Sequence, residues 1–227
     1  LVLAAETAIG AHPVDSVKMI NSIIKQYNRW TPESSLKDII RDWYSMNSNK
    51  SPVIWLTGMS GSGKTTLSSD LESYFLEKQY KVYVLDGDDI RGQDKEKLGF
   101  GHDDVLKNNL RIAYLCQKLR AEYDAIVVPV ISPYDDIRLQ VRGILEPNFH
   151  LVYLKSDINS LRDRDPKGLY AAADSGVINN LIGYSATNPY EKPSNAEVVI
   201  ETGNNISINK SKEELLTYFD KSIFIDE

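Results

Sequence analysis

Short apolar runs alternate with stretches of helical spacing along residues 53–201 of the chain. An apolar run of about five residues between polar turns is typical of a buried strand, whereas apolar residues three and four apart are typical of one face of a helix. These patterns predict strands at 53–57, 81–85, 125–131, 150–154 and 197–201. They predict helices at about 64–78, 104–123, 134–145, 157–163 and 211–221.

Strands that alternate with helices predict a parallel sheet, because each right-handed crossover carries a helix back over one face of the sheet. The expected fold is therefore α/β, with a parallel β-sheet flanked by helices. The last helix is expected to open with a capping box, in which the side chains of Ser211 and Glu214 bond each other's backbone N–H groups.

The first part of the chain has a different pattern. Apolar residues within 14–27 recur at helical spacing, and the cap residue Thr31 predicts the start of a second helix. The polar, turn-rich stretch 45–52 is the expected boundary. We therefore divide the chain into an N-terminal helical extension, residues 1–48, and a main domain, residues 49–227.

The composition argues against several classes of protein. The formal net charge of −6 argues against nucleic acid as the main partner. No apolar run approaches the ~18 residues of a membrane span, and no signal peptide is visible. Cys116 is the only cysteine, so we expect no disulfide within the chain and a reducing, cytoplasmic setting. The sequence begins with Leu1, which we interpret as a processed chain or a segment of a longer polypeptide.

A glycine-rich turn joins the first predicted strand to the first predicted helix. Gly58 and Gly63-Lys64-Thr65 have the spacing G-x-x-x-x-G-K-[ST], in which the backbone curls so that its N–H groups point at phosphate oxygens. We expect Lys64 to reach the β- and γ-phosphates of a nucleoside triphosphate and the Thr65 hydroxyl to hold Mg²⁺. The predicted nucleotide-binding residues of this turn are Gly58, Ser60, Gly61, Ser62, Gly63, Lys64, Thr65 and Thr66.

Charged residues follow two other predicted elements, and sites in parallel sheets lie at the carboxyl ends of strands. After the second strand come Asp86, Asp88 and Arg91. One acid can orient Mg²⁺, one can accept the proton of an attacking hydroxyl, and the arginine can bind an acceptor phosphate, although a solvated turn is an alternative. The segment 164–170, Arg-Asp-Pro-Lys-Gly-Leu-Tyr, indicates either a cationic lid over the transferring phosphoryl group or a charged surface loop.

These motifs follow one another along the chain in an order that resembles the adenylyl-sulfate kinase (APS kinase) family. The resemblance spans residues 50–202 and includes Leu-Gly-Phe at 98–100, Ile-Ser-Pro-Tyr at 131–134 and Pro-Tyr-Glu at 189–191. It implies a fold of the P-loop NTPase type and a dependence on ATP and Mg²⁺. It further implies transfer of the γ-phosphate of ATP to the 3′-hydroxyl of a small-molecule nucleotide, adenosine 5′-phosphosulfate (APS).

The resemblance also implies roles for single residues. Asp88 is the expected base, Asp86 lies beside the metal with Thr65, and Lys64 and Lys167 take part in catalysis. Arg164 joins the ATP-binding residues. The residues expected to border the acceptor are Arg91, Phe100, Asn108, Ile131, Ser132, Lys167 and Leu181.

Four positions depart from the family pattern, all on the acceptor side. Val105 replaces an arginine, Asp135 a basic residue, Leu181 an aromatic residue and Val130 a common phenylalanine. An altered pocket of this kind would permit the same chemistry on another nucleotide-linked acceptor, such as cytidine diphosphoramidate in surface-polysaccharide modification. A nucleotide-binding module without catalysis is the alternative from another class.

A shorter resemblance concerns the N-terminal extension. Residues 6–14, Glu-Thr-Ala-Ile-Gly-Ala-His-Pro-Val, resemble a segment near the end of the pyruvate kinase barrel. The rest of a barrel is absent, so we expect no pyruvate kinase activity. Trp30 and Trp43 would give these helices an apolar face that a second subunit can cover, which favours a homodimer.

Overall fold

Five parallel strands form the single sheet of the computed structural model, which describes residues 51–87, 90, 99–185 and 187–223. Their spatial order is β2-β3-β1-β4-β5, so that β1 lies at the centre and pairs with both β3 and β4. The strands are β1 (Val53–Thr57), β2 (Val82–Val84), β3 (Ala125–Pro129), β4 (Phe149–Lys155) and β5 (Val198–Glu201). This sheet confirms the expected α/β fold.

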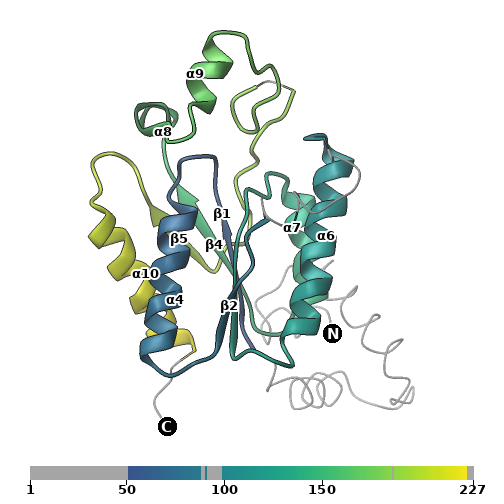
Figure 1. The fold of residues 1–227 in the computed structure, drawn as a ribbon, viewed down its shortest axis with the longest axis vertical. Helices are drawn as coiled ribbons and strands as arrows, with labels where there is room; N and C mark the ends of the chain where they lie inside the picture. The colour runs from purple at the N-terminus through teal and green to yellow at the C-terminus, as the bar shows by residue number, and fades with distance from the viewer. Residues whose placement is uncertain (1–50, 88–89, 91–98, 186, 224–227) are drawn as a thin grey trace, which may run out of the picture. The chain divides into compact units, whose positions relative to one another are not determined.

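Helices cover both faces of the sheet (Figure 1). On one face lie α4 (Lys64–Glu77) and α10 (Ile208–Ser222), and on the other lie α6 (His102–Leu119) and α7 (Asp135–Leu145). The side chains of β1 alternate between two cores, with Trp55 packed on the α6 and α7 face and Leu56 on the α4 and α10 face. Because both faces are covered, the strand is apolar from Val53 to Leu56 instead of alternating with polar residues.

Two short helices, α8 (Ile158–Arg164) and α9 (Leu169–Asp174), lie beyond the carboxyl ends of the strands (Figure 1). The sequence predicted α8 but not α9. The Asp165 carboxylate accepts hydrogen bonds from the backbone N–H groups of Tyr170 and Ala171, at 3.2 and 2.9 Å, and so caps α9. A helix of six residues is too short to show helical periodicity in the sequence, which is why the pattern indicated only a lid or loop there.

The start of α10 corrects one prediction. The helix begins at Ile208, and its N-cap is Ser207, whose side chain accepts a hydrogen bond from the N–H of Lys210. The expected capping box at Ser211 is therefore wrong. Ser211 is buried inside the helix, and its hydroxyl donates to the carbonyl of Glu201 at 2.8 Å. That bond attaches the first turn of α10 to the end of β5.

Several predictions concern residues outside those that the structure describes. They include the N-terminal extension, its pyruvate kinase-like segment and the helices that carry Trp30 and Trp43. Among the described residues, no helix is both long enough and apolar enough to cross a bilayer.

Candidate active site

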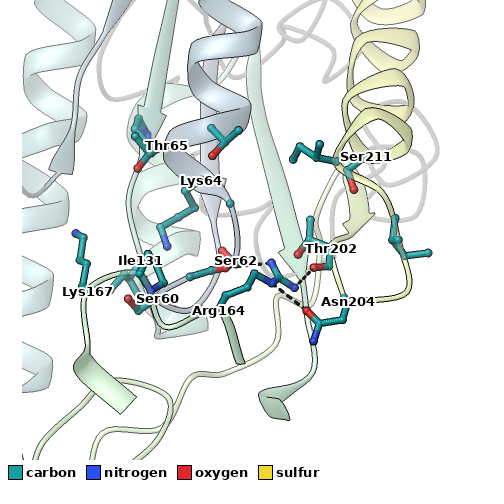
Figure 2. A pocket seen from close by; sticks show the side chains of 18 of the residues that line it. Ser60, Ser62, Lys64, Thr65, Ile131, Arg164, Lys167, Thr202, Asn204 and Ser211 are labelled. Carbon is teal, nitrogen blue, oxygen red and sulfur yellow. Dashed lines mark hydrogen bonds between the residues drawn. The ribbon is translucent and has the colours of Figure 1, made fainter. Parts of the chain in front are cut away.

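A cavity of about 690 Å³ lies at the carboxyl ends of the strands, beside the glycine-rich turn (Figure 2). It collects residues from Ser60 to Ser211, about 150 positions apart in the sequence. The predicted site residues that line it are Ser60, Gly61, Ser62, Gly63, Lys64, Thr65, Thr66, Asp86, Ile131, Arg164 and Lys167. The nucleotide-side predictions, the strand-end acid and the lid segment (residues 164–170) therefore meet in one place.

The glycines of the turn are required by its geometry. Gly61 and Gly63 have φ values of 76° and 92°, the left-handed region that side chains disfavour. At Gly58, an added Cβ would lie 2.8 Å from the backbone oxygen of Leu154. Gly63 is the residue before α4, so the turn delivers the chain directly into a helix N-terminus, where backbone N–H groups can bind an anion.

Lys64 lies across the turn that it follows. Its Nζ donates hydrogen bonds to the carbonyl oxygens of Gly58 and Met59, both at 2.8 Å. These bonds hold the ammonium group above the turn, on the side of the cavity (Figure 2). A cation in this position can neutralise the phosphates of a nucleotide that the backbone N–H groups bind.

Arg164 joins the turn to the end of β5. Its guanidinium donates to the Gly61 carbonyl at 3.1 Å and to the Asn204 side-chain oxygen at 3.3 Å. It also donates to the Ser156 hydroxyl at 3.2 Å and to the Thr202 carbonyl. These bonds use the edges of a planar group, whose faces can stack on a flat ring. A guanidinium held in this way can stack on a nucleobase.

The lid segment also contacts the turn through Tyr170. Its hydroxyl donates to the carbonyl of Ser60 at 2.8 Å. Burial raises the pKa of Tyr170 to about 12, so the hydroxyl keeps its proton and remains a donor.

The predicted acceptor residues are only partly gathered. Ile131 and Lys167 line the cavity, whereas the lining does not include Phe100, Asn108, Ser132 and Leu181. On the nucleotide side, Gly58 is the predicted residue that the lining does not include. Phe100 is 45% exposed, and Leu181 packs in an apolar cluster with Leu161 and Tyr170. Asn108 is buried, and its Oδ1 has no hydrogen-bond partner in the described part of the chain. Asp88 and Arg91 lie outside the described residues.

Two of the residues that depart from the family pattern make contacts within the domain. Val105 is buried in an apolar cluster with Tyr134 and Ile137. Asp135 pairs with the fully buried Arg138, at 2.9 Å between Oδ1 and Nη2. Neither position adds a cation to the acceptor side.

The sequence did not indicate three contributors to this region. Thr202 and Asn204 line the cavity from the turn after β5, and Arg138 supports the segment after β3. The rule that sites lie at the carboxyl ends of parallel strands could have indicated the turn after β5, because β5 runs parallel to the other strands. No such signal marks Arg138, since a charged residue on an amphipathic helix normally faces solvent.

His102 makes a pH-dependent contact between α6 and α7. Its Nε2 lies 3.2 and 3.1 Å from the two carboxylate oxygens of Asp136, and this bond raises the pKa of His102 above its ordinary value of 6.5. Asp103 also lies near the ring, with its Oδ1 3.6 Å from Nδ1. The pair joins the first turn of α6 to the first turn of α7.

We expect this pair to stabilise the fold at low pH and to lose its effect as the pH rises. The folded pKa lies above the unfolded one, so the contribution is fully present below 6.5 and disappears as the pH passes the raised value. His102→Gln should therefore lower the thermal midpoint more at about pH 5.5 than at about pH 8.5. An equal loss at both values would contradict the pair.

Nuclear magnetic resonance supplies the control. Burial lowers the pKa of His150 to about 4, so its signal should titrate well below that of His102. Only the His102 signal should vanish in the His102→Gln variant.

The fold and the cavity together define a P-loop phosphotransferase. The chain belongs to the adenylyl-sulfate kinase family, because the family model described as adenylylsulphate kinase matches residues 50–201. An adenylyl-sulfate kinase of Staphylococcus epidermidis is 41% identical over 181 residues, which cover 79% of this chain and 89% of that protein. One of Bacillus pumilus is 37% identical over 190 residues, which cover 83% of this chain and 93% of the relative.

A solved structure agrees with the sequence matches. The Mycobacterium tuberculosis APS kinase CysC, in complex with AMPPNP and APS, superimposes with a TM-score of 0.66 at 31% identity. The match covers 75% of this chain and 98% of that one.

Proposed function

We propose that this enzyme transfers the γ-phosphate of ATP to the 3′-hydroxyl of APS and so forms 3′-phosphoadenosine 5′-phosphosulfate. The observation that supports this most is the single cavity lined by the glycine-rich turn, Asp86 and Lys167. Donor binding, a strand-end acid and a lid cation are the components that phosphoryl transfer requires. The Mycobacterium tuberculosis relative, solved with AMPPNP and APS, supports the same pair of substrates.

On the donor side, backbone N–H groups of residues 60–65 bind the β- and γ-phosphates, and Lys64 neutralises their charge. Arg164 stacks on the base with the face of its guanidinium. The Thr65 hydroxyl and the Asp86 carboxylate, which line the same cavity, are oxygen ligands of the kind that Mg²⁺ prefers. When bound, Mg²⁺ would neutralise charge on the phosphates.

On the acceptor side, Asp88 accepts the proton of the attacking 3′-hydroxyl. A new bond forms between that oxygen and the γ-phosphorus, the bond to the β,γ-bridging oxygen breaks, and ADP leaves. Lys167 stabilises the charge on the phosphoryl group in transfer. The buried Asn108 Oδ1, which has no donor among the described residues, suits a hydrogen bond from the acceptor.

A second acceptor class keeps the same chemistry. Val105 is buried among apolar residues and Asp135 is paired internally, so two positions that are cationic in the family supply no cation here. The missing cations favour a test of a second acceptor class. A coupled assay of ADP release would compare APS with CDP- and UDP-linked compounds, including cytidine diphosphoramidate. The proposal requires APS to have the highest kcat/KM, and a higher value for a pyrimidine conjugate would transfer the assignment to that conjugate.

Asp88→Asn tests catalysis separately from binding. We expect turnover to fall about 10²-fold or more, because the amide cannot accept the proton, while the affinity for ATP stays nearly unchanged. Asp89→Asn, which removes the same charge one position away, is the matched control and should retain turnover. Equal turnover in wild type and Asp88→Asn would remove Asp88 from this role. An absence of turnover by wild type with every acceptor would favour a binding module without catalysis.

A further inference from the structure

Two consecutive asparagines lie on the buried side of α6. Asn108 is a predicted acceptor contact, whereas Asn109 has no role in the reaction described above. Asn109 is 1% exposed, and its Nδ2 donates to the hydroxyl oxygen of Ser132 at 2.7 Å. Ser132 is itself 1% exposed, so the hydrogen bond joins two groups that are both removed from water.

The surroundings of Asn109 make this polar group unusual. Its neighbours on the buried face of α6 are the apolar residues Val105, Ile112, Ala113 and Cys116. An amide is costly among apolar side chains unless it is hydrogen-bonded, and a leucine would fill similar space without that cost. The bond to Ser132 is therefore the physical reason for an asparagine at this position.

Ser132 has a backbone conformation that needs support. Its φ is 44°, in the left-handed region, which a residue with a Cβ adopts only where surrounding contacts hold it. Arg138 Nη1 donates to its carbonyl oxygen at 2.6 Å, and Thr57 Oγ1 approaches the same oxygen at 3.3 Å. Asn109 supplies the remaining contact, to the side chain. The residue is thus held from three separate elements of the fold.

The Asn109–Ser132 bond lies one residue away from the lining of the cavity. Ser132 follows Ile131, which lines the cavity and whose carbonyl oxygen accepts from Thr57 Oγ1 at 2.5 Å. On the other side of the bond, Asn109 follows Asn108, whose buried Oδ1 has no donor among the described residues. The Asn109–Ser132 bond therefore ties together the two segments that carry Ile131 and Asn108.

We propose that Asn109 is a positioning residue for the acceptor: its bond to Ser132 fixes Ile131 and Asn108 relative to each other. Asn109 acts through these neighbours and does not touch the substrates. The inference rests on the proposed function, since it uses that assignment of the acceptor side. Loss of the bond should weaken acceptor binding and leave the donor side unaffected.

The test compares Asn109→Leu, Ser132→Ala and the double variant. Each single change should raise KM for APS by about three- to tenfold, the effect of one hydrogen bond, with kcat nearly unchanged. The affinity for AMPPNP, measured by calorimetry, should equal that of wild type. Because both residues act through the same bond, KM for APS in the double variant should be no higher than in the single variant with the higher KM.

Gln117→Ala is the matched control. Its side-chain amide also makes a hydrogen bond outside α6, donating to the carbonyl of Ile144 at 2.8 Å. Gln117 lies more than two turns after Asn109 in the helix and is exposed. This variant loses one tertiary hydrogen bond of the same helix, so it reports what a purely structural loss does. We expect KM for APS to stay at the wild-type value.

Hydrogen exchange gives a readout that needs no acceptor. The backbone amides of Ile131 and Ser132 should exchange faster in Asn109→Leu than in wild type or Gln117→Ala. Unchanged exchange there, or an equal loss of AMPPNP and APS affinity, would overturn the inference. If wild type does not use APS while exchange responds as expected, the proposed acceptor fails and the positioning role of Asn109 stands.

Discussion

Replacing Lys64 by alanine is expected to lower kcat by about 10²- to 10³-fold, because a fixed cation beside the transferring phosphoryl group is lost. The ammonium group is held above the glycine-rich turn by the carbonyl oxygens of Gly58 and Met59. In this position Lys64 lines the cavity. Affinity for AMPPNP should fall as well, since Lys64 also neutralises the bound phosphates.

The measurement is steady-state turnover with APS, together with calorimetry for AMPPNP. Lys78→Ala is the matched control, because Lys78 caps the other end of α4 and pairs with Asp220 at 3.2 Å, away from the cavity. That exposed pair should affect neither quantity. The role of Lys64 would be refuted by turnover in Lys64→Ala that matches the Lys78→Ala control.

Replacing Arg138 by methionine is expected to have the largest effect on stability, about 3–5 kcal/mol. The guanidinium is fully buried and donates to the Ser132 carbonyl, the Glu191 carbonyl and the Asp135 carboxylate, at 2.6, 2.7 and 2.9 Å. Methionine fills much of the space but leaves a partly buried carboxylate and two carbonyl oxygens without their donor. Such uncompensated polar groups cost more than the lost bonds themselves.

Urea unfolding measures this loss, provided that the slope of the transition is compared between variants. Arg162→Met is the control, because Arg162 makes an exposed ion pair with Asp174, and such a pair contributes little to stability. Arg138→Lys should fall between wild type and Arg138→Met, since an ammonium cannot reach all three acceptors in one plane. Equal stability of the Arg138→Met and Arg162→Met proteins would contradict the assigned role.

The central part of the fold could be predicted because its signals are local. The first strand was predicted with its observed bounds, Val53–Thr57, since an apolar run stands between Pro52 and Gly58. The P-loop followed from spacing alone, because its backbone conformation requires glycine at fixed positions. The cap of α10 was misplaced because Ser207 and Ser211 are both capable cap residues, and only packing against Glu201 decides between them.

The candidate site was predictable only in part. The residues of the turn, Asp86 and Lys167 belong to recognisable motifs, and the cavity brings them together. The bonds that hold the acceptor side, such as Asn109 to Ser132, could not be predicted, because they link residues distant in sequence and a polar residue on a helix is usually exposed. Asp88 and Arg91 remain predictions from the sequence, because they lie outside the described residues.

The hydrogen bonds between the lid segment and the glycine-rich turn have a consequence for product release. Tyr170 holds the carbonyl of Ser60, and Arg164 holds that of Gly61. A lid that swings outward to let ADP escape must break both bonds or pull the turn with it. If residues 164–170 act as a lid, we expect nucleotide binding and lid closure to be coupled, so that the step that frees ADP also loosens the peptide groups that hold its phosphates.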